Sequence, residues 1–103
     1  MKLKPVKSYK DLLVWQRAMG MVEDVYALTR QFPPSEAFGL SAQLRRSAVS
    51  IPSNVAEGNG FRRGRDCIRL LVVARASTQE LETQLLIAER LKYASSSDAQ
   101  RVL

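Results

Sequence analysis

The sequence predicts an all-α protein, an antiparallel up-and-down four-helix bundle with a short or truncated fourth helix. Apolar residues recur in steps of three and four over most of the 103 residues. Proline or glycine interrupts this pattern at short connections, and no stretch has the alternating pattern of a strand. With 46% hydrophobic residues, the chain is long enough for one core. We therefore expect a single domain over residues 1–103, in which residues 1–7 form a basic N-terminal arm.

The first helix is expected to begin at a capping box of Ser8 and Asp11 and to end near Gln31, before two prolines. Its apolar residues form two adjacent seams. One seam contains Leu12, Trp15, Met19, Val22, Tyr26 and Thr29, and the other contains Val14, Ala18, Met21, Val25 and Leu28. One seam is enough to pack a helix in a small bundle. The second seam predicts contact with another subunit, unless both form one wide core-facing stripe of a monomer.

The second helix is expected from about residues 34–36 to Gly58, because the glycines of residues 58–60 take positive φ without penalty and would end it. The third helix is expected from about Asp66 to about Lys92. Residues 95–98 have the composition of a helix cap. Residues 99–103 are then long enough only for the stub of a fourth helix.

A polar face accompanies the apolar face of the second helix. We predict that its residues form a structural network with a glutamate of the third helix, and that the members are Gln43, Arg46, Asn54, Glu57 and Glu80. Such a network would fix the register of the helices. The same cluster could instead bind a phosphate or position a water molecule.

The sequence offers little for catalysis. It contains no histidine, no metal-ligand pattern and no paired nucleophile and base. We therefore predict no catalytic residue, no metal site and no cofactor. An enzyme that uses Arg46, Glu57 and Glu80 is the alternative with the least support.

Charge is the stronger indication of function. Sixteen Lys and Arg residues against ten Asp and Glu residues give a net charge of +6. This excess favours an acidic partner such as RNA or DNA, although the charge could serve solubility alone. The candidate nucleic-acid-binding residues lie in two groups, Lys2, Lys4, Lys7 and Lys10 in the chain's first ten residues and Arg62, Arg63, Arg65 and Arg69 around the second interhelical connection. Because arginine and lysine contact phosphates without reading base identity, we expect binding that depends little on sequence.

The single cysteine, Cys67, cannot form an internal disulfide, which fits a reducing cytoplasm. A membrane span needs about 20 consecutive apolar residues, and no segment comes near this length. The N-terminus also lacks the apolar region of a signal peptide. We therefore expect a cytoplasmic protein without a membrane partner.

Three long segments resemble the bacterial four-helix bundle proteins known as the 23S rRNA-intervening-sequence, or S23-like, family. They read YKDLLVWQRAM, LTRQFPPSEAFGLSAQLRRSAVSIPSNVAEG and STQELETQLLIAERLKY. The resemblance implies a helical bundle that assembles as a homopentamer and has no established enzymatic activity or cofactor. It also implies a fold similar to the accessory variability protein of diversity-generating retroelements, in which a basic surface works with nucleic acid and a reverse transcriptase.

Two features depart from the family pattern. Members usually have a complete fourth helix, whereas this chain ends at Leu103 after about two turns, and they tend to have glycine where Ala76 stands. The expected function is a non-enzymatic homo-oligomeric bundle that binds RNA or DNA, with a partner protein as a further candidate. The alternative is a structural or protein-interaction module whose charge is incidental.

Overall fold

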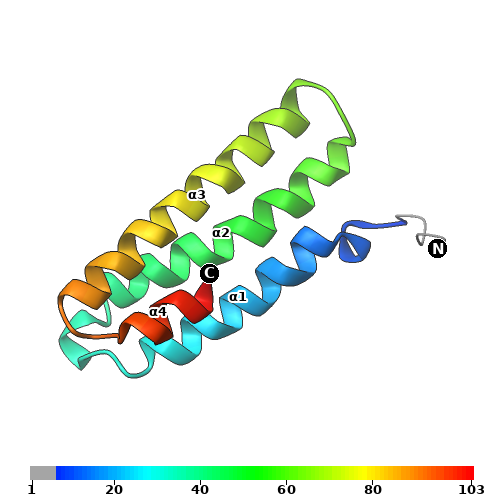
Figure 1. Ribbon diagram of the computed structural model, residues 1–103. Coiled ribbons are helices and arrows are strands. Elements are labelled where there is room, and N and C mark those ends of the chain that lie inside the picture. The colour runs from blue at the N-terminus through cyan, green and yellow to red at the C-terminus, as the bar shows by residue number, and fades with distance from the viewer. Residues whose placement is uncertain (1–6) are drawn as a thin grey trace.

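The computed structural model describes residues 7–103 and confirms the predicted all-α fold. Its elements are the 3-10 turn η1 (Tyr9–Asp11), α1 (Leu13–Thr29), the 3-10 turn η2 (Pro34–Glu36), α2 (Leu40–Phe61), α3 (Arg65–Arg90) and α4 (Ser96–Val102). Figure 1 shows α1, α2 and α3 running antiparallel along the length of the molecule. The short α4 packs against α1 and α3 at the end remote from the α2–α3 connection.

The first helix begins later than predicted. The capping box forms, because the Ser8 hydroxyl accepts a bond from the Lys10 amide and the Asp11 carboxylate accepts one from the Ser8 amide. It caps only η1, however. Leu12 is extended, with ψ of 127°, and α1 starts at the next residue. A bond of 2.9 Å from the Gln16 side chain to the Lys10 carbonyl holds η1 against α1.

The second helix also begins later, because η2 and α2 are separate elements. Residue Gly39 interrupts them with φ of −107° and ψ of −116°. The Glu36 carboxylate bridges the break by accepting a bond of 3.2 Å from the amide of Leu40. This bond satisfies one of the amides that have no partner within the first turn of a helix.

The predicted end of the second helix is wrong, since α2 continues through residues 58–60 to Phe61. Gly58 lets α3 pack closely against α2. A Cβ atom there would lie 3.4 Å from the Cys67 carbonyl oxygen and 3.5 Å from the Leu70 Cβ. The chain reverses instead at Arg62 and Gly64, which have φ of 62° and 98°.

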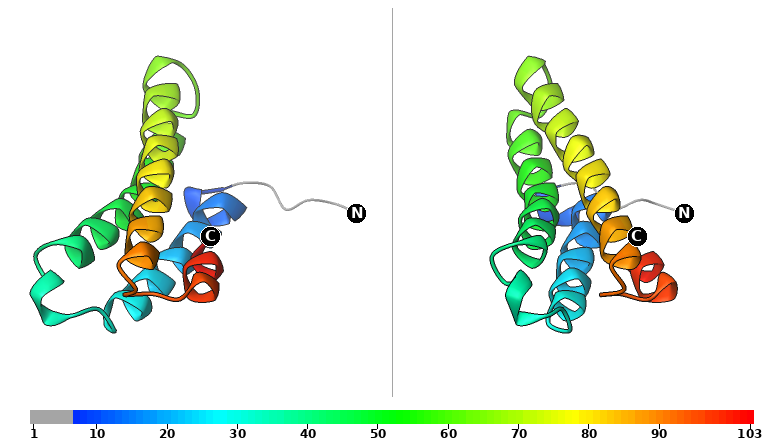
Figure 2. Two further views of the ribbon diagram at one scale, coloured as in Figure 1. Left: turned by 60° about the vertical axis from the view of Figure 1, so that its left-hand side comes forward. Right: turned by 90° about the vertical axis from the view of Figure 1, so that its left-hand side faces the viewer.

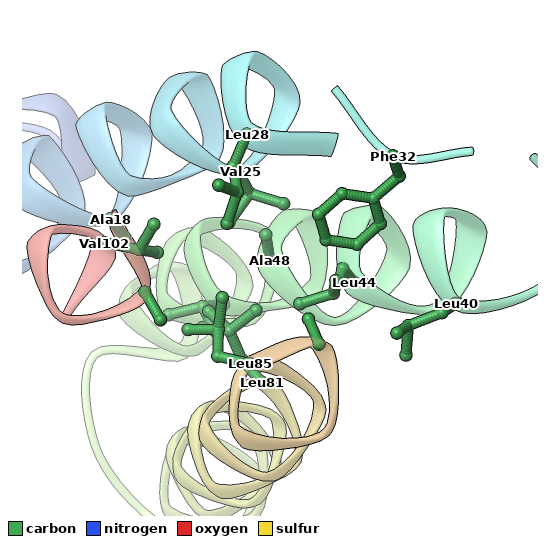
Figure 3. Packing of buried hydrophobic residues seen from close by; sticks show 13 residues of the cluster. Ala18, Val25, Leu28, Phe32, Leu40, Leu44, Ala48, Leu81, Leu85 and Val102 are labelled. Carbon is green, nitrogen blue, oxygen red and sulfur yellow. The ribbon is translucent and has the colours of Figure 1, made fainter. Parts of the chain in front are cut away.

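The core lies between all four α-helices, in the lower half of the bundle as drawn in Figure 1, and Figure 3 shows its packing. Its largest fully buried side chains are Val25, Leu44, Leu81 and Leu85. On α1, the seam that contains Val25 supplies the core, whereas Met19 of the other seam is 42% exposed. The seam of Met19 is divided, because its Val22 packs against the core and its Thr29 is buried.

The N-terminal half of α3 is more exposed to solvent, because α2 and α3 extend beyond the ends of α1 and α4 (Figure 2). Large apolar side chains remain exposed along α3, namely Ile68, Leu71, Val72, Val73, Leu86 and Ile87. We call these six residues the exposed apolar residues of α3. Ala76 is exposed as well, so the departure from glycine at this position affects no close helix crossing within the chain.

Candidate nucleic-acid interface and polar cleft

Four arginines gather at the end of the bundle where α2 turns into α3 (Figure 1), and we call Arg62, Arg63, Arg65 and Arg69 the basic cluster. All four are exposed. Of these four, only Arg69 forms an ion pair with another of residues 7–103. Its side chain lies 3.7 Å from that of Asp66, and both side chains are more than half exposed. Exposed pairs of this kind contribute little energy. The basic cluster thus presents several guanidinium groups to solvent.

Hydrogen bonds hold the backbone under the basic cluster. The amide of Arg62 bonds to the Asn59 carbonyl at 3.0 Å, and that of Arg63 bonds to the Phe61 carbonyl at 2.7 Å. Gly64 then precedes the first turn of α3, where the Ile68 amide bonds to its carbonyl. These bonds hold the backbone from which Arg62, Arg63 and Arg65 project. The ring of Phe61, 52% exposed, adjoins them and could stack on a base.

The lysines form a second, separate group. Lys7 and Lys10 are exposed at the start of α1, on the half of the bundle that carries the α2–α3 connection (Figures 1 and 2). The Lys10 ammonium lies 6.0 Å from the centre of the Tyr9 ring. Lys2 and Lys4 lie outside the described residues. The α2–α3 turn therefore lies further along the bundle than Lys7 and Lys10, so the two basic groups are not side by side.

A cleft of about 480 Å³ separates α2 from α3 below the basic cluster. It is lined by Gln43, Arg46, Ser47 and Ser50 of α2 and by Ser77, Glu80 and Gln84 of α3, and we call it the α2–α3 cleft. Three residues of the predicted polar network, Gln43, Arg46 and Glu80, therefore meet at one site.

The other two network residues lie elsewhere. The side chain of Asn54 donates bonds of 2.7 Å and 2.9 Å to the carbonyl and hydroxyl of Ser50, one turn back. Glu57 is exposed and does not line the cleft. Arg46, Glu57 and Glu80 form no ion pair among residues 7–103. Arg46 and Glu57 share a helix face, but eleven residues at 1.5 Å each separate them by about 16 Å along the axis.

A family model for 23S rRNA-intervening sequence proteins matches residues 10–103. The chain belongs to this family. The match spans α1 to α4 and includes the basic cluster and the α2–α3 cleft. The 23S rRNA-intervening sequence proteins are not a known enzyme family. No curated protein matches the chain significantly.

Residues 7–103 were also compared with the requirements of a membrane-spanning helix and of a metal site. No helix in that range has the length and apolar character to cross a membrane. The same residues contain no group of three or more cysteine or carboxylate side chains that could hold a metal ion.

The predicted network did not include Ser50, which shares the polar face of α2, and sequence reasoning missed the three other residues of the cleft, Ser47, Ser77 and Gln84. All three are buried polar side chains. The Ser77 hydroxyl lies 2.8 Å from the Ser50 hydroxyl and links α3 to α2. A signal was available, because Ser77 and Gln84 are one heptad apart and interrupt the apolar positions of α3.

Proposed function

We propose that this member of the 23S rRNA-intervening sequence family is a non-enzymatic homo-oligomer whose basic cluster binds RNA or DNA without strong sequence specificity. The observation that carries the proposal is the α2–α3 turn. It presents Arg62, Arg63 and Arg65 without an ion pair among residues 7–103, on a backbone fixed by its own hydrogen bonds.

The chemistry of the cluster suits phosphate. A guanidinium group presents parallel N–H donors that match two phosphate oxygens. Contacts of this kind position a nucleic acid but do not distinguish its bases. A stacking contact from Phe61 would add affinity for unpaired bases of any identity. One such cluster is a small site, so repetition in an oligomer would raise the affinity through avidity.

Support for self-association comes from the exposed apolar residues. Monomeric proteins rarely leave large contiguous apolar surfaces in water. Here six large apolar residues of α3 are exposed, and Trp15, Met19 and Val22 of α1 line an apolar cleft of about 320 Å³ against α2. Burial of such surfaces between copies would stabilise an assembly, and the family resemblance suggests five subunits.

Light scattering of the purified protein tests the assembly. We expect a mass several times that of one 11.6 kDa chain. A monomeric mass at tens of micromolar protein would contradict self-association. A dimer or a tetramer would retain the interface and exclude the pentamer.

A salt titration tests the binding. Mixed-sequence RNA and DNA should bind at low salt, and the logarithm of the affinity should fall linearly with the logarithm of the salt concentration. The reason is that each neutralised phosphate of duplex DNA releases about 0.9 counterion. Absence of binding at low salt would favour the alternative, a structural module in which the exposed apolar residues of α3 contact another copy of the chain or a partner protein.

A further inference from the structure

One residue that lines the α2–α3 cleft carries an unsatisfied acceptor. Gln84 lines the cleft and is only 8% exposed, and its Oε1 atom is buried with no hydrogen-bond partner among the described residues. Buried amide oxygens almost always accept a hydrogen bond. A hydrogen-bond donor from outside the chain would satisfy the Oε1 atom of Gln84.

The same cleft contains an unused donor. Asn54 donates to the Ser50 hydroxyl, which lies 2.8 Å from that of Ser77. Whichever serine donates to the other, one hydroxyl hydrogen of the pair remains free. Ser47, which is 5% exposed, lines the same cleft. The cleft can therefore donate as well as accept.

The walls carry opposite charges that do not neutralise each other. Arg46 and Glu80 both line the cleft, yet no ion pair within 4.0 Å joins them. Since α2 and α3 are antiparallel and Ser50 contacts Ser77, Arg46 lies level with Glu80, and Gln43 lies level with Gln84. An anionic end of a ligand would face Arg46 and the serine hydroxyls, and a cationic end would face Glu80 and Gln84.

The size and lining of the cleft narrow the class of ligand. Its volume of about 480 Å³ lies within the range of small-molecule sites and is far above the roughly 30 Å³ of one water. A nucleobase is a poorer fit, because it carries no charge and is usually held by aromatic stacking. The residues that line the cleft include no aromatic side chain.

We infer that the α2–α3 cleft binds a small zwitterion of the amino-acid class. Arg46 and the free serine hydroxyl hold its carboxylate, while Glu80 and the amide oxygen of Gln84 hold its ammonium group. This site is separate from the basic cluster, and its occupancy does not depend on nucleic-acid binding.

Titration of the full chain with each of the common L-amino acids, followed by amide NMR shifts, tests the site. At least one should cause saturable shifts confined mainly to residues 43–50 and 77–84. Its N-acetyl and methyl ester derivatives each lack one charge, so each should bind about tenfold more weakly or worse. Absence of shifts at millimolar concentration with every amino acid would overturn the inference. Equal binding of both derivatives, or stronger shifts with uncharged nucleosides, would also overturn it.

Single substitutions locate the site. Arg46→Gln, Glu80→Gln and Gln84→Met should each weaken binding about tenfold or more. Arg69→Gln and Glu82→Gln change exposed charges outside the cleft and should leave it unaltered. Gln84→Met removes the unsatisfied oxygen at nearly constant volume, so this variant should remain folded. Unchanged affinity in Gln84→Met and Glu80→Gln would contradict the assignment. Cleft shifts that appear only on raising the protein concentration would assign the cleft to a second copy of the chain, which also overturns it.

Discussion

The Tyr93 hydroxyl donates a hydrogen bond of 3.0 Å to Oε2 of Glu36, a residue 57 positions earlier in the chain. The other oxygen of the same carboxylate accepts the Leu40 amide at the start of α2. The ring of Tyr93 also packs on Phe32, with centroids 5.5 Å apart. One carboxylate thus connects the segment after α3 with the first turn of α2.

This contact predicts a pH effect. The hydrogen bond to Glu36, followed by burial and the charge of Glu36, raises the pKa of Tyr93 above its ordinary value of 10.0. The folded chain therefore holds the phenolic proton more tightly than the unfolded chain does. The stabilisation is complete below pH 10.0 and is lost as the pH rises through the raised pKa. The Tm difference between the wild type and Tyr93→Phe should be constant near neutral pH and shrink above pH 10.0. A difference that does not change with pH would contradict the contact.

The end of α2 predicts a stabilising substitution. Gly60 is helical and exposed, its φ is not positive, and a Cβ atom there would meet no atom within 4 Å. Gly60→Ala should raise the free energy of unfolding by about 0.5–1 kcal/mol, because glycine loses more backbone entropy than alanine in a helix. The Tm should rise by several degrees in thermal denaturation. A fall in Tm would show that residues 58–60 end the helix, as the sequence had suggested.

The α2 polar face predicts a contrast between two substitutions. Ser50→Ala removes the hydroxyl that joins Asn54 and Ser77, and it should lower the free energy of unfolding by about 1–2 kcal/mol. Glu57→Ala changes an exposed residue without an ion pair among residues 7–103, and should change it by at most about 0.5 kcal/mol. Urea denaturation measures both. A larger loss for Glu57→Ala than for Ser50→Ala would restore Glu57 to the network.

The fold could be predicted further than the site. Apolar periodicity identifies the seam of Ala18, Val25 and Leu28 because burial in a bundle requires that spacing. The end of α2 could not be predicted in the same way, since glycine at 58 permits either a turn or the close approach of α3. The choice depends on contacts with Cys67 and Leu70, which the local sequence does not reveal.

The α2–α3 cleft was predicted only in part for a related reason. Helical periodicity shows on which side of a helix a residue lies, but not whether two residues on that side are close together. It therefore groups Glu57 with Arg46 although they lie several turns apart. Ser77 and Gln84 were missed because polar side chains are mostly exposed, and their burial depends on how α3 lies against α2. The basic cluster could be predicted from the order of residues alone, because its arginines lie in or next to one short connection.

The most direct test of the proposed function compares the salt dependence of nucleic-acid binding in two triple variants. One replaces Arg62, Arg63 and Arg65 by alanine at the α2–α3 turn. Its control replaces Arg30, Arg90 and Arg101, which are exposed at the other end of the helices, so both variants lose the same charge. We predict that the turn variant binds RNA and DNA more weakly and with a flatter salt slope, while the control keeps most of both. Equal losses in the two variants would show that only net charge matters, and would contradict a binding site at the basic cluster.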